Sequence, residues 1–119
     1  MSVEGKISYV EFPSKNIATT KKFFSEVFSW SFTDYGKEYT VFSAEGLNGG
    51  FYQADLSSTT ASGGALIVLY SSQLKETQAK IEGANGRIVK PVFAFPGGHR
   101  FHFCDPNGNE YAVWSDKGA

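Results

Sequence analysis

The feature that most constrains the fold is an order of elements that occurs twice along the chain. Residues 6–55 are predicted to form a strand, a helix and three further strands, and residues 64–116 follow the same order. The segment LSSTTASGG at 56–64 lies between them and is predicted to be a linker or mobile loop, because it is polar and has no periodicity. One half has too few strands to close a core, whereas two halves together can bury one.

Hydrophobic periodicity and turn residues give the individual elements. The expected strands cover 6–12, 30–33, 39–43, 50–54, 65–70, 87–95, 99–104 and 110–115, and the expected helices cover 17–28 and 74–81. Pro13 is expected to end its strand, and Pro91 to put its strand at an edge or bulge. Ser14 or Asn16 is predicted to cap the first helix, and Ser72 the second.

The fold class that follows is α+β. We expect two tandem βαβββ modules, at about 6–55 and 64–116, within a single domain spanning residues 1–119. The two modules are predicted to form a curved mixed sheet around a cavity, with the helices on the outside.

Composition narrows the functional classes. The net charge is −1, so the chain has no basic surplus for nucleic acid, and no apolar run is long enough for a membrane span or a signal peptide. With one cysteine, Cys104, it cannot form an internal disulfide framework. A cytoplasmic location is the default expectation. The 16% aromatic content favours a sheet-rich protein that binds a small molecule.

Two segments carry a resemblance to a known family. They are ISYVEFPSKNIATTKKFFSEVFSW at 7–30 and KPVFAFPGGHRFHFCDPNGNEYAVWS at 90–115. Both resemble the vicinal-oxygen-chelate superfamily of glyoxalases, bleomycin-resistance proteins and ring-cleaving dioxygenases, and in particular its glyoxalase-related branch. The resemblance implies a paired βαβββ fold, a homodimer, and a divalent metal held by His, Glu or Gln from the first and last strands of each half. It also implies that some members bind a drug without a metal.

The resemblance also places the four metal-ligand positions on this chain. They fall on Tyr9, Phe51, Ala65 and Ala112. A divalent cation needs several His, Asp or Glu donors that converge on one point, and only the Tyr9 hydroxyl offers even a weak donor here. We therefore expect neither a metal at the usual position nor any other cofactor.

A displaced catalytic group is an alternative. Glu11, His102 and Glu110 fall on predicted strands and could converge if the sheet face that lines the cavity, away from the helices, carries all three. Such a set could bind a metal or act as a general acid and base, with His102 as the proton carrier. The competing interpretation is that His102 and Glu110 form an ordinary cross-strand polar pair.

The leading functional hypothesis is metal-independent binding of a small, aromatic organic molecule in the cupped sheet. Its expected ligand-binding residues are Tyr9, Tyr39, Phe51, Arg100 and Trp114, with Arg100 orienting an anionic group. The alternative is a glyoxalase-like lyase or isomerase, or a dioxygenase, that uses Glu11, His102 and Glu110. A third possibility is an interaction module whose aromatic face forms a dimer or partner interface. The sequence leaves open whether the chain is an enzyme.

Overall fold

The computed structural model describes residues 3–43 and 46–118, and the predicted order of elements is confirmed there. The first module contains β1 (Val10–Ser14), α1 (Ile17–Phe28), β2 (Ser31–Asp34), β3 (Tyr39–Ser43) and β4 (Gly49–Gln53). The second module contains β5 (Ile67–Tyr70), α2 (Leu74–Gly83), β6 (Arg87–Phe95), β7 (Gly98–Cys104) and β8 (Glu110–Ser115). The α+β class and the tandem modules are therefore correct.

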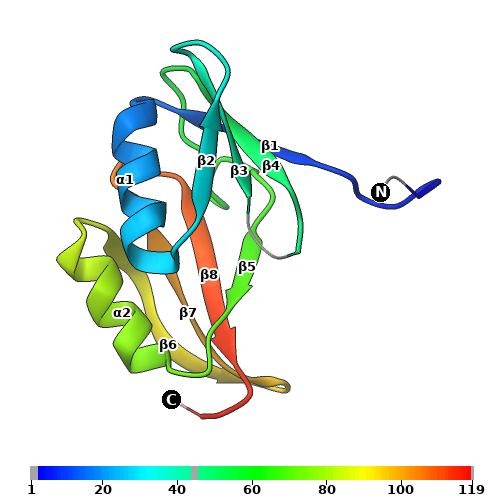
Figure 1. Ribbon diagram of the computed structural model, residues 1–119. Helices are drawn as coiled ribbons and strands as arrows, with labels where there is room; N and C mark the ends of the chain where they lie inside the picture. Colours follow the sequence, from blue (N-terminus) through cyan, green and yellow to red (C-terminus); the bar gives the residue numbers. More distant parts are fainter. Residues whose placement is uncertain (1–2, 44–45, 119) are drawn as a thin grey trace.

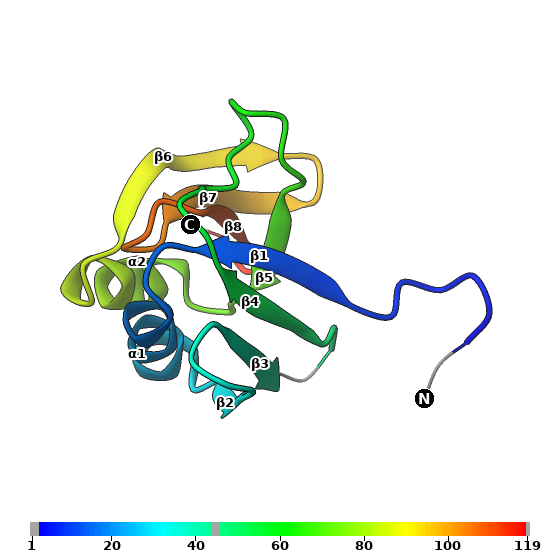
Figure 2. The same cartoon turned by 90° about the horizontal axis from the view of Figure 1, so that it is seen from above.

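Each module forms its own four-stranded mixed sheet. The strand order is β1-β4-β3-β2 in the first sheet and β5-β8-β7-β6 in the second. In both sheets the first strand of the module runs parallel to the last, and the other pairs are antiparallel. Figure 1 shows one module above the other, with α1 and α2 on the same side of the molecule. Figure 2 shows the whole molecule from above, again with the two helices next to each other.

The core lies between the helices and the sheets. The side of each sheet that faces the helices is called its inner face, and the opposite side its outer face. The inner faces and helices share one cluster of buried apolar side chains: Phe12, Ile17, Phe23, Phe24, Val27, Phe42, Phe51, Leu74, Ile81, Phe101, Phe103, Tyr111 and Val113. Phenyl rings of α1 contact both sheets, since Phe24 packs on Phe51 and Tyr111, while Phe23 packs on Phe103. The first helix thus joins the two modules.

Local signals explain the ends of the first helix. Asn16 is its N-cap, and the Asn16 side-chain oxygen accepts a hydrogen bond from the Thr19 N–H at 3.1 Å. Ser29 follows the helix in the left-handed conformation, with φ of 60°, and its N–H bonds carbonyls of the last turn. The predicted cap at Asn16 is confirmed. In the second helix the prediction of Ser72 is wrong, because the N-cap is Gln73 and no described side chain caps this helix.

The first strand lies further along the chain than predicted. It begins at Val10 because that residue is the partner of Gly49, where β4 begins. Pro13 lies inside the strand and does not end it. This is possible because β1 is an edge strand and has no second neighbour to which Pro13 would need to donate. Pro91 behaves as predicted, since β6 is an edge strand and a register shift between Lys90 and Phe93 spans that residue.

A polar latch fixes the two modules to each other. The turn after β7 inserts two asparagines into the corner between β1 and α1 of the first module. The Asn109 amide donates to the Pro13 carbonyl at 2.7 Å, and the Asn107 amide donates to the Thr20 hydroxyl at 2.9 Å. Loss of the Asn109 side chain would remove this donor from the Pro13 carbonyl. Because Asn109 is fully buried, that loss would be costly in free energy.

The segment between the modules is held in place. The Ser57 hydroxyl donates to the Asn107 carbonyl, and the Ser58 N–H donates to the Asn109 side chain, both at 2.8 Å. The Ser58 carbonyl in turn accepts the Glu110 N–H at 2.8 Å. The segment connects the two modules as predicted, but the alternative of a mobile loop is wrong for Ser57 and Ser58, which are attached to the second module.

Candidate functional site

The predicted site residues divide between two outer faces and the core. Tyr9, Glu11 and Tyr39 lie together on the outer face of the first sheet. Arg100, His102, Glu110 and Trp114 lie on the outer face of the second sheet, as the β7–β8 pairing requires. Phe51 lies on neither outer face. It is fully buried on the inner face against Phe12 and Phe24, so its prediction as a ligand contact is wrong.

The first outer face holds a short chain of hydroxyls that ends at a carboxylate. The Tyr39 hydroxyl donates to Glu11 Oε2 at 2.9 Å, and the Tyr9 hydroxyl lies 2.5 Å from the Tyr39 hydroxyl. Since Tyr39 has one proton to donate, Tyr9 must be the donor in the second bond. Burial and the bonds to Tyr9 and Glu11 raise the pKa of Tyr39. This group is an internally paired network.

A histidine–carboxylate pair lies on the second outer face. His102 Nδ1 is 2.9 Å from Glu110 Oε2, and Thr60 donates to the other carboxylate oxygen with both its N–H and its hydroxyl, each at 2.9 Å. Burial raises the pKa of Glu110, but the bonds from His102 and Thr60 outweigh it and lower the pKa overall. An ionised Glu110 requires that His102 Nδ1 carries the proton. The other ring nitrogen, His102 Nε2, is buried and has no hydrogen-bond partner among the described residues.

Three buried side-chain nitrogens in the described part of the chain have no hydrogen-bond partner, and all three lie on β7. They are His99 Nδ1, Arg100 Nε and His102 Nε2. Two of them, on Arg100 and His102, belong to the outer face. His102 is only 6% exposed, so leaving its nitrogen unpaired has a free-energy cost that a bound polar group would remove.

The Arg100 side chain lies close to two phenyl rings. Its guanidinium carbon lies 5.3 Å from the centre of the Phe93 ring and 5.7 Å from the centre of the Phe95 ring, which is cation–π range. Lys90 Nζ lies 4.7 Å from the centre of the same Phe93 ring. Among the described residues neither cation has a carboxylate within salt-bridge distance. This part of the face therefore carries two cations that lack an acidic partner among the described residues.

A hollow of about 320 Å³ lies beside Arg100. Its other lining residues are Val68, Phe95, Gly97 and Trp114. The Trp114 ring packs edge-on against Tyr70 at 5.1 Å and against Phe95 at 6.3 Å, so its orientation is fixed by neighbours on two sides. The hollow therefore combines a flat apolar wall with one unpaired cation.

Sequence reasoning did not identify three residues of this site, which are Phe93, Phe95 and Thr60. Phe93 and Phe95 could have been found, because Phe93 pairs with Arg100 and residues two apart on a strand share a face. Thr60 could not have been found in this way. It lies in a segment without periodicity, and only the fold places it on Glu110.

The predicted convergence of Glu11 with His102 and Glu110 is wrong. The pair is formed, but Glu11 is bonded to Tyr39 on the first sheet. Across residues 3–43 and 46–118, no group of three or more His, Cys, Asp or Glu could hold a metal ion. Glu11 is separated from the pair because it belongs to the other module.

The positions expected to bind a metal do not supply suitable donors. Ala112 pairs with Val68 on β5, not with Ala65, which precedes that strand. On β4 the residue opposite Glu11 is Gly50, whereas Phe51 faces the core. Glycine, valine and alanine side chains carry no donor atom, and the Tyr9 hydroxyl is already bonded to Tyr39. The residues present do not fit the metal that the resemblance implies.

The family is shown by a sequence comparison. Residues 6–113 match the model of the Glyoxalase/Bleomycin resistance protein/Dioxygenase superfamily. The chain belongs to this superfamily. No curated protein matches its sequence. Across its described residues, neither helix of this superfamily member has the length and apolarity needed to cross a membrane.

Solved structures with the same fold come from several bacteria. A family enzyme from Burkholderia phytofirmans PsJN aligns with a TM-score of 0.78 at 12% identity, over 93% of this chain and 98% of its own. Lactoylglutathione lyase from Agrobacterium tumefaciens aligns with a TM-score of 0.70 at 15% identity, over 95% of both chains. A mutant of the fosfomycin resistance protein FosX from Listeria monocytogenes, in a complex with Mn(II) and a dihydroxypropylphosphonic acid, aligns with a TM-score of 0.76 at 16% identity. The alignment covers 99% of this chain and 93% of the FosX chain. At these identities the likeness concerns the fold.

Proposed function

We propose that this superfamily member binds a small organic anion with an aromatic body, without a metal, on the outer face of the second sheet. The observation that carries the proposal is Arg100, whose charge is held between two phenyl rings and lacks an acidic partner in the described part of the chain. A carboxylate can accept two hydrogen bonds from a guanidinium, and an aromatic body can pack on Trp114. The volume of about 320 Å³ suits a ligand of one or two rings.

The test uses 2-naphthoate, which has a planar body and one carboxylate. Calorimetric titration is carried out before and after removal of metal ions with EDTA. We expect the same affinity in both, because the site requires no cation. Arg100→Gln should weaken binding by roughly 10- to 100-fold, the usual effect of losing a hydrogen bond to a charged group. Arg87→Gln is the matched control, since Arg87 is exposed and lies at the far end of β6.

Two results would contradict the proposal. One is equal binding of 2-naphthoate by wild type and Arg100→Gln, which would mean that the anion is recognised elsewhere. The other is loss of binding after EDTA with recovery on addition of a divalent metal, which would show a metal site despite the missing donors.

A second candidate, a metal-independent lyase or isomerase, is favoured by His102. Its Nε2 atom is buried and unpaired, and Glu110 holds the other ring nitrogen, the arrangement of a general base. Phenylpyruvate offers a carboxylate for Arg100 and an acidic C–H for His102. Catalysed exchange of that hydrogen for deuterium, followed by NMR in D₂O, should occur in wild type and fall at least about tenfold in His102→Asn. An exchange rate equal to that in buffer without protein would contradict this second candidate, and binding would remain the proposed function.

The dioxygenase alternative and the homodimer stay predictions. A dioxygenase would need a redox metal held by residues other than those at the four family positions. Whether the protein forms a dimer can be measured by light scattering.

A further inference from the structure

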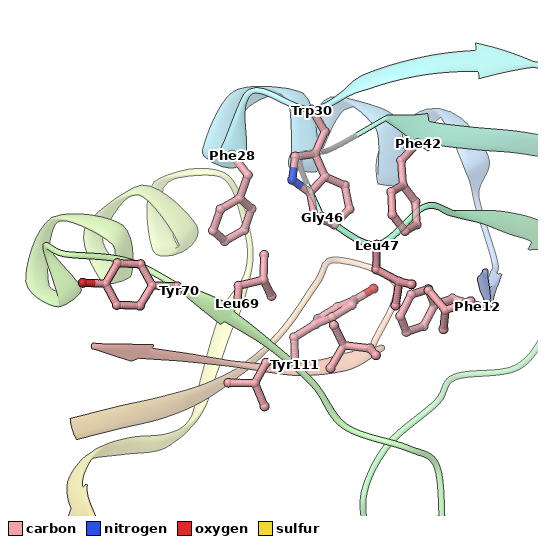
Figure 3. A pocket seen from close by; sticks show the side chains of 12 residues that line it. Phe12, Phe28, Trp30, Phe42, Gly46, Leu47, Leu69, Tyr70 and Tyr111 are labelled. Atoms are coloured by element: carbon pink, nitrogen blue, oxygen red, sulfur yellow. The ribbon is translucent and has the colours of Figure 1, made fainter. Parts of the chain in front are cut away.

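A second cavity lies between the two modules. It has a volume of about 470 Å³ and is larger than the hollow beside Arg100. Figure 3 shows it bounded by Phe28 and Trp30 on one side, by Phe12 and Phe42 on another, and by Leu69 and Tyr111 from the second module. No residue that the sequence singled out for function lines it. The two hollows share only Val68 among their described lining residues.

The chemistry of the lining selects the ligand. All twelve described lining residues are uncharged, and nearly all are aromatic or aliphatic. The two hydroxyls present are committed elsewhere, since Tyr70 donates to Asp116 at 2.6 Å and Tyr111 donates to Asp105 at 2.8 Å. A charged ligand would lose its hydration here without gaining a partner.

One side-chain hydrogen-bond donor in this lining has no partner among the described residues. No hydrogen bond joins the Trp30 indole N–H to any described residue, and Trp30 is only partly buried. Its ring is held between Phe24 and Phe42, with both ring centres 4.6 Å away. The indole is therefore a fixed donor at the wall of an apolar cavity.

We infer that the inter-module cavity is a second binding site, which takes an uncharged, largely apolar molecule with one hydrogen-bond acceptor for Trp30. A cavity of this size and lining is typical of small-molecule sites. The site is distinct from the anion-binding face, so each can exist without the other.

The two tryptophans make the sites separately observable, since Trp30 and Trp114 are the only ones in the chain. Each gives one indole N–H signal in a ¹⁵N NMR spectrum, and Trp30→Phe and Trp114→Phe assign the two signals. The probe is 2-acetylnaphthalene, which is uncharged and carries one carbonyl acceptor. We expect it to move the Trp30 signal in a saturable way and to leave 2-naphthoate binding at Trp114 unchanged.

A matched pair of exposed leucines provides the variants. Leu47 is 37% exposed and lines the cavity, whereas Leu56 is 59% exposed and does not. Leu47→Asp places a carboxylate against the apolar ligand and should weaken 2-acetylnaphthalene binding by at least about tenfold. Leu56→Asp should leave binding within about twofold of wild type, because its charge stays in water. If the NMR spectrum of Leu47→Asp shows that this variant is unfolded, Leu47→Asn is used in its place.

Three outcomes would overturn the inference: a Trp30 signal that does not respond to the probe, equal weakening by both leucine variants, or a Trp30 signal that moves with protein concentration instead. The last would mean that a second copy of the chain occupies the cavity. A protein that binds 2-acetylnaphthalene at Trp30 but fails to bind 2-naphthoate would refute the proposed function and leave this site standing.

Discussion

The outer faces of the two sheets come from the same βαβββ unit but differ in how their polar groups are paired. On the first face Tyr9 donates to Tyr39 and Tyr39 donates to Glu11, so the network ends on an acceptor. On the second face Arg100 and His102 each keep a buried nitrogen without a partner. Unpaired buried donors and acceptors reduce stability, and they persist where a ligand or reaction uses them.

The difference shows how one repeat can pair its polar groups while the other leaves some unpaired. Gly50 makes the first network possible, because a Cβ at that position would lie 2.5 Å from the Tyr39 hydroxyl and 2.7 Å from that of Tyr9. On the second sheet Ala112 occupies the β8 position that pairs with His102, and its small side chain leaves room for larger neighbours. Small residues thus fit a closed network in one module and an open site in the other.

The largest expected contrast comes from removing the carboxylate of each face. Glu110→Leu leaves His102 Nδ1 and both Thr60 donors without their acceptor, and should lower the free energy of unfolding by about 3 kcal/mol. Glu11→Leu removes one bond at an exposed face and should lower it by less than ~1 kcal/mol. Urea denaturation measures both. Equal losses would show that the two faces contribute alike.

A steric change tests the closed network with a smaller effect. Gly50→Ala pushes the new methyl group against two tyrosine side chains and should cost about 1–2 kcal/mol of unfolding free energy. In a Tyr39→Leu background the same substitution should cost less than about half as much, since the nearest obstructing atoms are gone. A double-mutant cycle from urea denaturation gives the coupling. Additive costs would mean that Tyr39 is not the obstructing group, which leaves the Tyr9 hydroxyl.

The sequence predicted the fold well because its signals are local. Periodicity placed α1 at its observed limits, and Asn16 and Pro91 acted as their chemistry predicts. The failures are non-local. The position of β1 depends on where β4 begins, 39 residues later by the pairing of Val10 with Gly49, and periodicity within one strand cannot supply that register.

The site was predicted in part for the same reason. His102 and Glu110 are joined by a hairpin, so strand alternation was enough to pair them. Glu11 was placed with them although it belongs to the other module, and Phe51 was placed on the wrong face by one residue. The inter-module cavity was missed altogether, because it arises from packing between halves that no local pattern records.

The smallest expected effect is a pH dependence that comes from Glu110. Bonds from His102 and Thr60 lower the pKa of Glu110 in the folded state, although burial opposes them. A carboxyl whose folded pKa lies below its unfolded value stabilises the fold above the unfolded pKa, and this stability is lost as pH falls through the folded pKa. Wild type should therefore lose more unfolding free energy than Glu110→Gln as pH falls from about 5 to 3. Both curves are measured by a series of urea denaturations over this range. If the Glu110→Gln and wild-type curves stay parallel, the carboxylate is not preferentially held ionised, and His102 Nδ1 need not be its donor.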